Sequence, residues 1–141
     1  MSAEICRRCH AMEQCYEFML AYAAQGVSGG DCSQSGGRIR EVLQQAVAAL
    51  SGLVEACVAP VKAEARESAD KYLAFLAVVE RDAHDSMRTI ELVLAQPTIS
   101  SQLIDNLNAS MHLRAVLTDL FLLSDITSTA RMSPAASTAA R

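Results

Sequence analysis

The residues of this chain that could do chemistry stand close to its N-terminus. Cys6, Cys9 and His10 belong to the string Cys-Arg-Arg-Cys-His, and Glu13 follows within one helical turn of His10. In a helix these four side chains share one face, because residues three and four apart are neighbours. Thiolate and imidazole suit Zn(II) or Cu(I), and a carboxylate could complete a tetrahedral zinc site. The pattern makes Cys6, Cys9, His10 and Glu13 a candidate site for zinc or another soft metal.

The same string also has the C-x-x-C-H spacing of the attachment signal for c-type haem. The resemblance to c-type cytochromes covers these five residues only, and neither Met111 nor His112 is singled out as an axial ligand. No apolar segment follows a basic start, so we expect no secretory signal and a cytoplasmic protein. Because haem is usually attached outside the cytoplasm, the compartment argues against haem. No cofactor is predicted, and the alternative is that this helix face is simply solvated.

Other candidate groups are weaker. Glu80 and His84 share a helix face, but di-iron bundles need two Glu-x-x-His motifs and further glutamates, which this chain lacks. Cys15 and Cys57 fit the spacing of small core residues, whereas Cys32 lies in a Gly/Ser-rich stretch and is expected to be exposed. Phosphate-binding, dinucleotide-binding and hydrolase motifs are not found in the sequence, so an enzyme is unsupported.

Composition predicts one helical domain. The chain has 141 residues, of which 51% are hydrophobic and only 4% aromatic. This length is sufficient for a buried core. The net charge of −4, with no basic stripe, argues against nucleic acid as a partner. The apolar runs are too short for a membrane span. Five cysteines are an odd number, which is consistent with free thiols in a reducing compartment.

Helical periodicity predicts the elements that position the candidate residues. Apolar residues recur every three or four positions in four segments, which run from Ala3 to Ala24, Arg38 to Val58, Val61 to Ala95 and Ser101 to Ile126. We predict an all-α, antiparallel four-helix bundle over residues 1–126, with a Gly/Ser-rich loop at 26–37 and a disordered tail at 127–141. Pro60 predicts a turn between the second and third helices, and a kinked continuous helix is the alternative.

The fourth predicted helix indicates how the protein acts. Its apolar residues cover more than half of its circumference, which a four-helix monomer cannot easily hide. We therefore predict an interaction surface that includes Leu103, Leu107, Leu117, Leu120 and Phe121. A homodimer or a partner helix would cover this surface. The predicted function is a non-enzymatic interaction protein, such as an adaptor, chaperone or regulator. The alternative is a metal- or haem-binding bundle that uses the N-terminal cluster.

Overall fold

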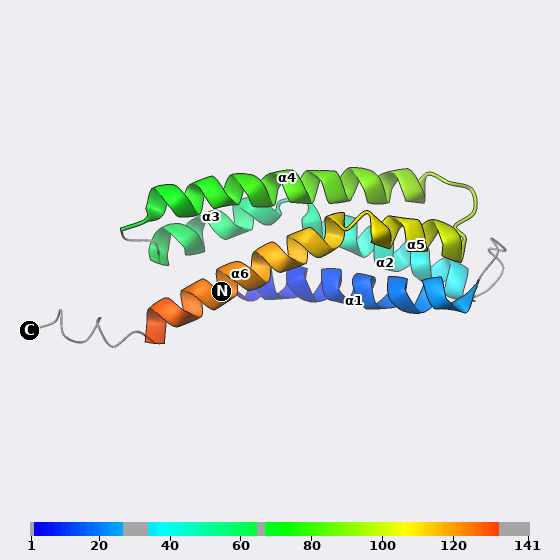
Figure 1. The fold of residues 1–141 in the computed structure, drawn as a ribbon, viewed down its shortest axis with the longest axis horizontal. Coiled ribbons are helices and arrows are strands. Elements are labelled where there is room, and N and C mark those ends of the chain that lie inside the picture. Colours follow the sequence, from blue (N-terminus) through cyan, green and yellow to red (C-terminus); the bar gives the residue numbers. More distant parts are fainter. Residues whose placement is uncertain (1, 27–33, 65–66, 133–141) are drawn as a thin grey trace, which may run out of the picture.

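The computed structural model describes residues 2–26, 34–64 and 67–132, and every regular element in these ranges is an α-helix (Figure 1). This confirms the all-α class. The prediction of four unbroken helices is wrong, because the described ranges hold six. They are α1 (Ala3–Gln25), α2 (Gln34–Leu50), α3 (Leu53–Glu64), α4 (Ala69–Leu94), α5 (Ser101–Ala109) and α6 (His112–Met132).

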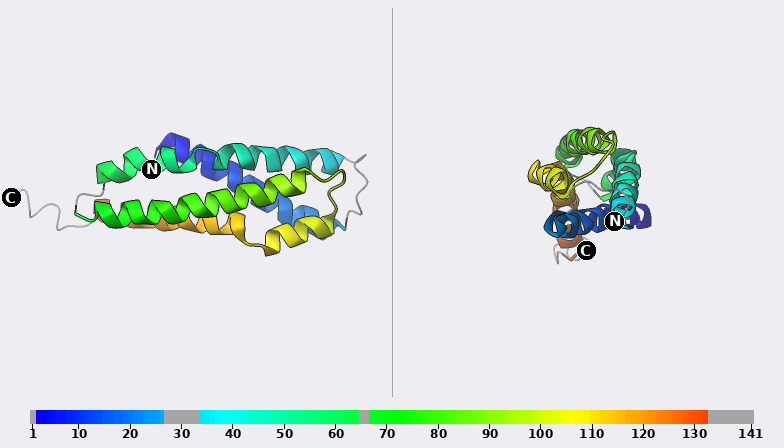
Figure 2. Two further views of the ribbon diagram at one scale, coloured as in Figure 1. Left: turned by 90° about the horizontal axis from the view of Figure 1, so that it is seen from above. Right: turned by 90° about the vertical axis from the view of Figure 1, so that its right-hand side faces the viewer.

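The helices run along the long axis of an elongated molecule. The chain runs one way in α1, returns through α2 and α3, runs forward again in α4 and returns through α5 and α6 (Figure 1). Helix α1 packs against α2 and α5, and α4 packs against α2, α3 and α6. Seen from one end, the helices surround a shared interior (Figure 2). Fully buried side chains from different helices meet there, among them Met12, Leu43, Val79, Ile104 and Leu120.

Helix α1 begins and ends where local chemistry dictates. The Ser2 side chain caps it, because its Oγ accepts a hydrogen bond from the Ile5 backbone N–H at 3.3 Å. Gly26 ends it in the left-handed conformation, with φ of 68°, which glycine adopts without steric cost. The predicted first helix is therefore correct to within one residue.

The second break in the chain lies away from the predicted proline. Helix α2 ends at Leu50, and Gly52 has φ of 78°, so the left-handed turn is made there. Pro60 lies inside α3, so the predicted turn at this residue is wrong. The two helices are bent by 43° at their break. Helices α2 and α3 run in the same direction, and the chain reverses direction after α3, between Glu64 and Ala69 (Figure 1). The predicted third helix, Val61 to Ala95, is therefore divided between α3 and α4.

The predicted fourth helix is also broken. Met111 separates α5 from α6 with φ of 66°, a left-handed conformation that costs a side-chain-bearing residue about 1–2 kcal/mol. Ser110 stabilises the end of α5 by donating its hydroxyl to the Leu107 carbonyl at 2.5 Å. Helix α6 then runs to Met132, beyond the predicted end at Ile126, so the predicted tail starts too early. The remainder of that tail, and Cys32 of the predicted loop, lie outside the described residues.

Candidate functional site

The N-terminal cluster is divided between the core and the surface. Cys9 is 8% exposed and belongs to the core, whereas Cys6 and His10 are exposed. The Cys9 thiol donates a hydrogen bond to Glu13 Oε1 at 3.2 Å. Burial, this bond and the Glu13 charge raise the pKa of Cys9 to about 12, which keeps the thiol protonated at neutral pH.

The four candidate residues therefore differ in burial, with Cys9 in the core and Cys6 and His10 at the surface. Within residues 2–26, 34–64 and 67–132, the structure shows no group of three or more His, Cys, Asp or Glu side chains placed to hold an ion. Glu80 and His84 are both exposed and border an open depression beside the start of α3. His112 is half-buried at the start of α6.

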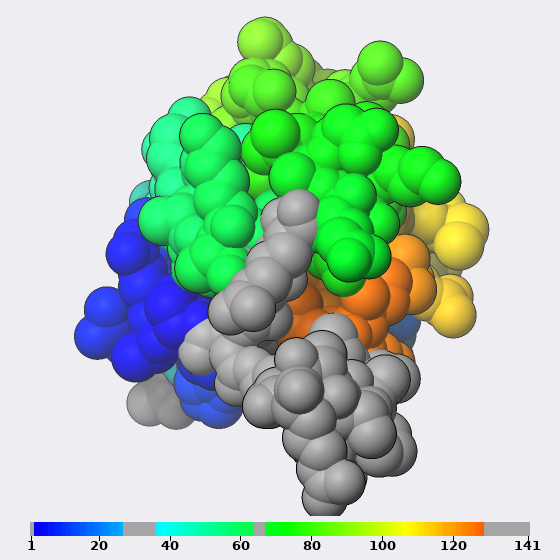
Figure 3. Space-filling view, turned by 90° about the vertical axis from the view of Figure 1, so that its left-hand side faces the viewer, coloured from blue at the N-terminus to red at the C-terminus, as the bar shows by residue number. Residues whose placement is uncertain are grey.

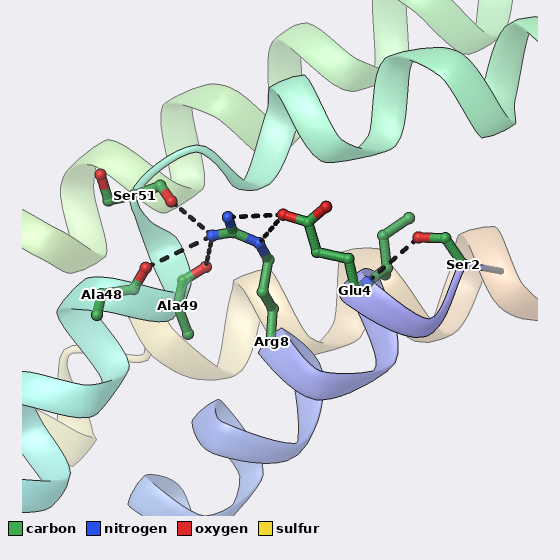
Figure 4. Close-up of polar contacts among 7 residues, drawn as sticks. Ser2, Glu4, Arg8, Ala48, Ala49 and Ser51 are labelled. Atoms are coloured by element: carbon green, nitrogen blue, oxygen red, sulfur yellow. Dashed lines mark hydrogen bonds and ion pairs between the residues drawn. The ribbon is translucent and has the colours of Figure 1, made fainter.

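Arg8, inside the same string, has a structural role that sequence reasoning missed. Its Nη1 donates to the Ala49 carbonyl at 2.9 Å and also reaches the carbonyls of Ala48 and Ser51 (Figure 4). These carbonyls lie at the end of α2, where the last turn of a helix has no internal donor. A cation there also stabilises the negative end of the helix dipole. Arg8 thus holds the end of α2 against α1.

Two neighbours support this arrangement. Glu4 accepts hydrogen bonds from Arg8 Nε at 3.1 Å and from Nη2 at 2.9 Å, which orients the guanidinium (Figure 4). A Cβ atom at Gly52 would lie 3.5 Å from Nη2, so the guanidinium packs closely over the turn between α2 and α3. The Glu4–Arg8 spacing of four was the available sequence signal, but it could not identify carbonyls some forty residues away.

Arg40 plays the matching role at the other end of the molecule. It donates to the Leu94 carbonyl at 3.2 Å, to Gln96 at 2.8 Å and to Pro97 at 3.0 Å. These carbonyls belong to the last residue of α4 and to the residues just after it, so an arginine on α2 caps α4 just as Arg8 on α1 caps α2. Both contacts stabilise the fold by satisfying carbonyls at the ends of helices.

The predicted interaction surface is largely interior. Leu107, Leu117 and Leu120 are at most 8% exposed, and Leu103 packs partly buried against the core. Phe121 is 48% exposed. The break at Met111 explains this distribution, because α5 and α6 can each turn an apolar side inward.

A different set of apolar side chains remains outside, along the line where α4 and α6 meet. Phe75, Val78 and Asp82 share one side of α4, at spacings of three and four. Helix α6 carries Ala115, Asp119, Leu122 and Ile126 on one side at spacings of four, three and four. Val78 is 46%, Leu122 48% and Ile126 42% exposed. We name Val78, Asp82, Asp119, Leu122 and Ile126 the α4–α6 face.

Contact between two aspartates fixes the register of this face. Asp82 and Asp119 interact across the two helices, which run in opposite directions (Figure 1). The side chains that precede Asp82 on α4 therefore lie beside those that follow Asp119 on α6. The helices are seen side by side from the end of the molecule in Figure 3. Val78 thus lies on the same stretch of surface as Leu122 and Ile126.

The two aspartates are electrostatically strained. Asp119 Oδ2 is buried and accepts no hydrogen bond. Burial first, then the nearby carboxyl group of Asp82, raise the pKa of Asp119 to about 7. Ionised carboxylates only accept hydrogen bonds, so these two can bond each other only when one carries a proton. At neutral pH this pair readily gains or loses that proton.

Among the described residues, no single helix combines the length and apolar character needed to cross a bilayer. The bent pair Gly36–Leu50 and Leu53–Ala63 meets both requirements together. The apolar side chains Ile39, Leu43 and Leu53 from this pair are fully buried in the core of the molecule.

The sequence was compared with protein-family models, curated proteins and solved structures, and none of the three comparisons gives a match.

Proposed function

We propose that this chain is a cytoplasmic, non-enzymatic interaction protein, an adaptor, chaperone or regulator, that binds a protein partner through the α4–α6 face. One observation carries the proposal. Half-exposed Val78, Leu122 and Ile126 lie together on one stretch of surface beside the two aspartates. Contiguous apolar side chains at a helix–helix groove suit a partner helix, which would cover them. Self-association as a homodimer would use the same surface.

We also infer that the molecule is an antiparallel four-helix bundle with two broken members. The direction of the chain supports this grouping, because α2 and α3 run the same way, as do α5 and α6 (Figure 1). In such a bundle α4 and α6 are neighbours, and their outer groove is open to a fifth helix.

Apolar burial alone gives this surface limited affinity. Covering the exposed half of three aliphatic side chains contributes about 1 kcal/mol each, or roughly 3 kcal/mol in all. A millimolar complex already requires about 4 kcal/mol, before the cost of ordering side chains. A partner must therefore gain further free energy from groups beside these three.

Sedimentation equilibrium and binding of an apolar dye test the proposal. We expect concentration-dependent association or dye binding by the full chain, and loss of either in the double variant Leu122→Gln/Ile126→Gln. Leu20→Gln is the matched control, since Leu20 is 46% exposed but lies on α1, which takes no part in the α4–α6 face. A monodisperse monomer that binds no dye would remove the support for this function, as would equal loss in the control.

A further inference from the structure

The α4–α6 face combines apolar and acidic groups in a fixed order. The apolar part consists of Val78, Leu122 and Ile126. The acidic part lies one helical turn away, because Asp82 follows Val78 by one turn on α4 and Asp119 precedes Leu122 by one turn on the antiparallel α6. Asp85 continues the same side of α4 with another acid. The nearest base is the exposed Arg81, which flanks the face three residues after Val78 and four before Asp85, and on α6 the half-buried His112 lies two turns before Asp119. The face is therefore apolar at one end and acidic at the other.

We propose that the α4–α6 face binds an amphipathic helix of a partner protein that places a lysine or arginine one or two turns from its apolar residues. The apolar residues would cover Val78, Leu122 and Ile126, and the basic group would pair with Asp82 and Asp119. This inference rests on the proposed function, which it deepens by naming the chemistry of the partner. Such an arrangement supplies the additional free energy that the apolar contacts lack.

The two aspartates decide between a basic partner and an apolar one. An apolar helix laid over them would bury two acceptor groups and bring no donor, which costs free energy for each unpaired group. A guanidinium brings five donors in a plane and a full positive charge, so it can satisfy both carboxylates. A second copy of this chain is disfavoured, because it carries the same net charge of −4 and would present the same acids.

Three synthetic helices provide the test. Each helix carries a fluorescein label and two leucines four residues apart. The three differ only in the residue one turn after the second leucine, which is Arg, Gln or Glu. Anisotropy with the full chain at pH 8 should show the Arg helix binding roughly tenfold more tightly than the Gln helix, and the Glu helix most weakly. The double variant Asp82→Asn/Asp119→Asn should abolish the advantage of Arg. Asp105→Asn, an exposed acid on α5, should preserve it.

The pH dependence gives an independent readout. The Arg helix should bind several-fold more tightly at pH 8 than at pH 5.5, because the aspartates lose their shared proton and gain charge over this range. Self-association that buries the protonated Asp82–Asp119 pair against apolar residues of a second copy would instead be tighter at pH 5.5 than at pH 8. Association that strengthens on acidification would therefore identify self-association and overturn the basic partner.

The remaining outcomes separate this inference from the proposed function. If the Arg and Gln helices bind equally and Leu122→Gln weakens both, the basic partner is excluded while an interaction surface remains. If no helix binds at about 1 mM, the inference fails, and the sedimentation and dye experiments decide the function separately. If a chain that ends at residue 132 binds the helices more tightly, residues 133–141 occupy the face, and an external partner helix is not its natural ligand.

Discussion

Replacing Arg8 by methionine should destabilise the protein, although Arg8 lies on the surface of α1. Methionine keeps much of the apolar stem but removes every donor from the carbonyls of Ala48, Ala49 and Ser51. A hydrogen bond to a charged group contributes about 1.5–3 kcal/mol when shielded from water. The Arg8 side chain is 22% exposed and only its bond to Ala49 is both short and part-buried, so we expect a loss of about 2 kcal/mol.

Arg7 provides a matched control, because it is adjacent in sequence, carries the same charge and is exposed. Arg7→Met should change the free energy of unfolding by no more than about 0.5 kcal/mol. Urea denaturation followed by far-UV circular dichroism measures both variants. Glu4→Gln should cost under about 1 kcal/mol, since an exposed ion pair is worth little.

Salt dependence separates the two parts of the Arg8 contact. In about 1 M salt the effect of Glu4→Gln should shrink, because exposed charges are screened. Most of the effect of Arg8→Met should remain, since hydrogen bonds to part-buried carbonyls are screened less. Equal stabilities for Arg7→Met and Arg8→Met would refute the argument that Arg8 holds α2 against α1.

Three further predictions concern protonation, backbone conformation and thiol access. The pKa of Asp119 is raised from 3.8 to about 7, so its contribution to stability is full below pH 3.8 and is lost as pH rises towards 7. Asp119→Asn should therefore gain roughly 1–2 kcal/mol over the parent between pH 5 and pH 8, after allowance for solvent exposure, and a pH-independent difference in urea would count against this. Gly52→Ala should lower the unfolding temperature at a cost of about 1 kcal/mol, whereas Gly37→Ala, in a helix with open space around it, should raise it. A thiol reagent should label exposed Cys6 rapidly and Cys15, whose pKa burial raises to about 12, only on unfolding; equal labelling rates would contradict the burial.

The periodic spacing of apolar residues predicted the fold class and most of the core residues. The α1 boundaries followed from a serine cap and a terminal glycine, both visible in the sequence. Cys15 and Cys57 were predicted as core residues and are buried. These predictions succeeded because each depends on local spacing and on the conformational preferences of single residues.

The breaks within the long helices were less predictable. Pro60 is the strongest breaker in its segment, yet the turn forms at Gly52, where Arg8 from α1 satisfies the exposed carbonyls. Met111 carries no turn signal at all, but it adopts a left-handed conformation. A residue held in such a conformation depends on contacts made by its neighbours, so its position in the sequence does not reveal it.

For the candidate sites, too, local features followed from the sequence, whereas contacts between helices did not. The sequence by itself determined that the chain is helical, which residues form the apolar side of most helices, and that Cys6, Cys9, His10 and Glu13 are neighbours along one helix. The tertiary structure decided that Cys9 turns inward, and it brought Asp82 on α4 close to Asp119 on α6. The physical reason is that helix periodicity is local, whereas the register between α4 and α6 arises from packing of side chains nearly forty residues apart.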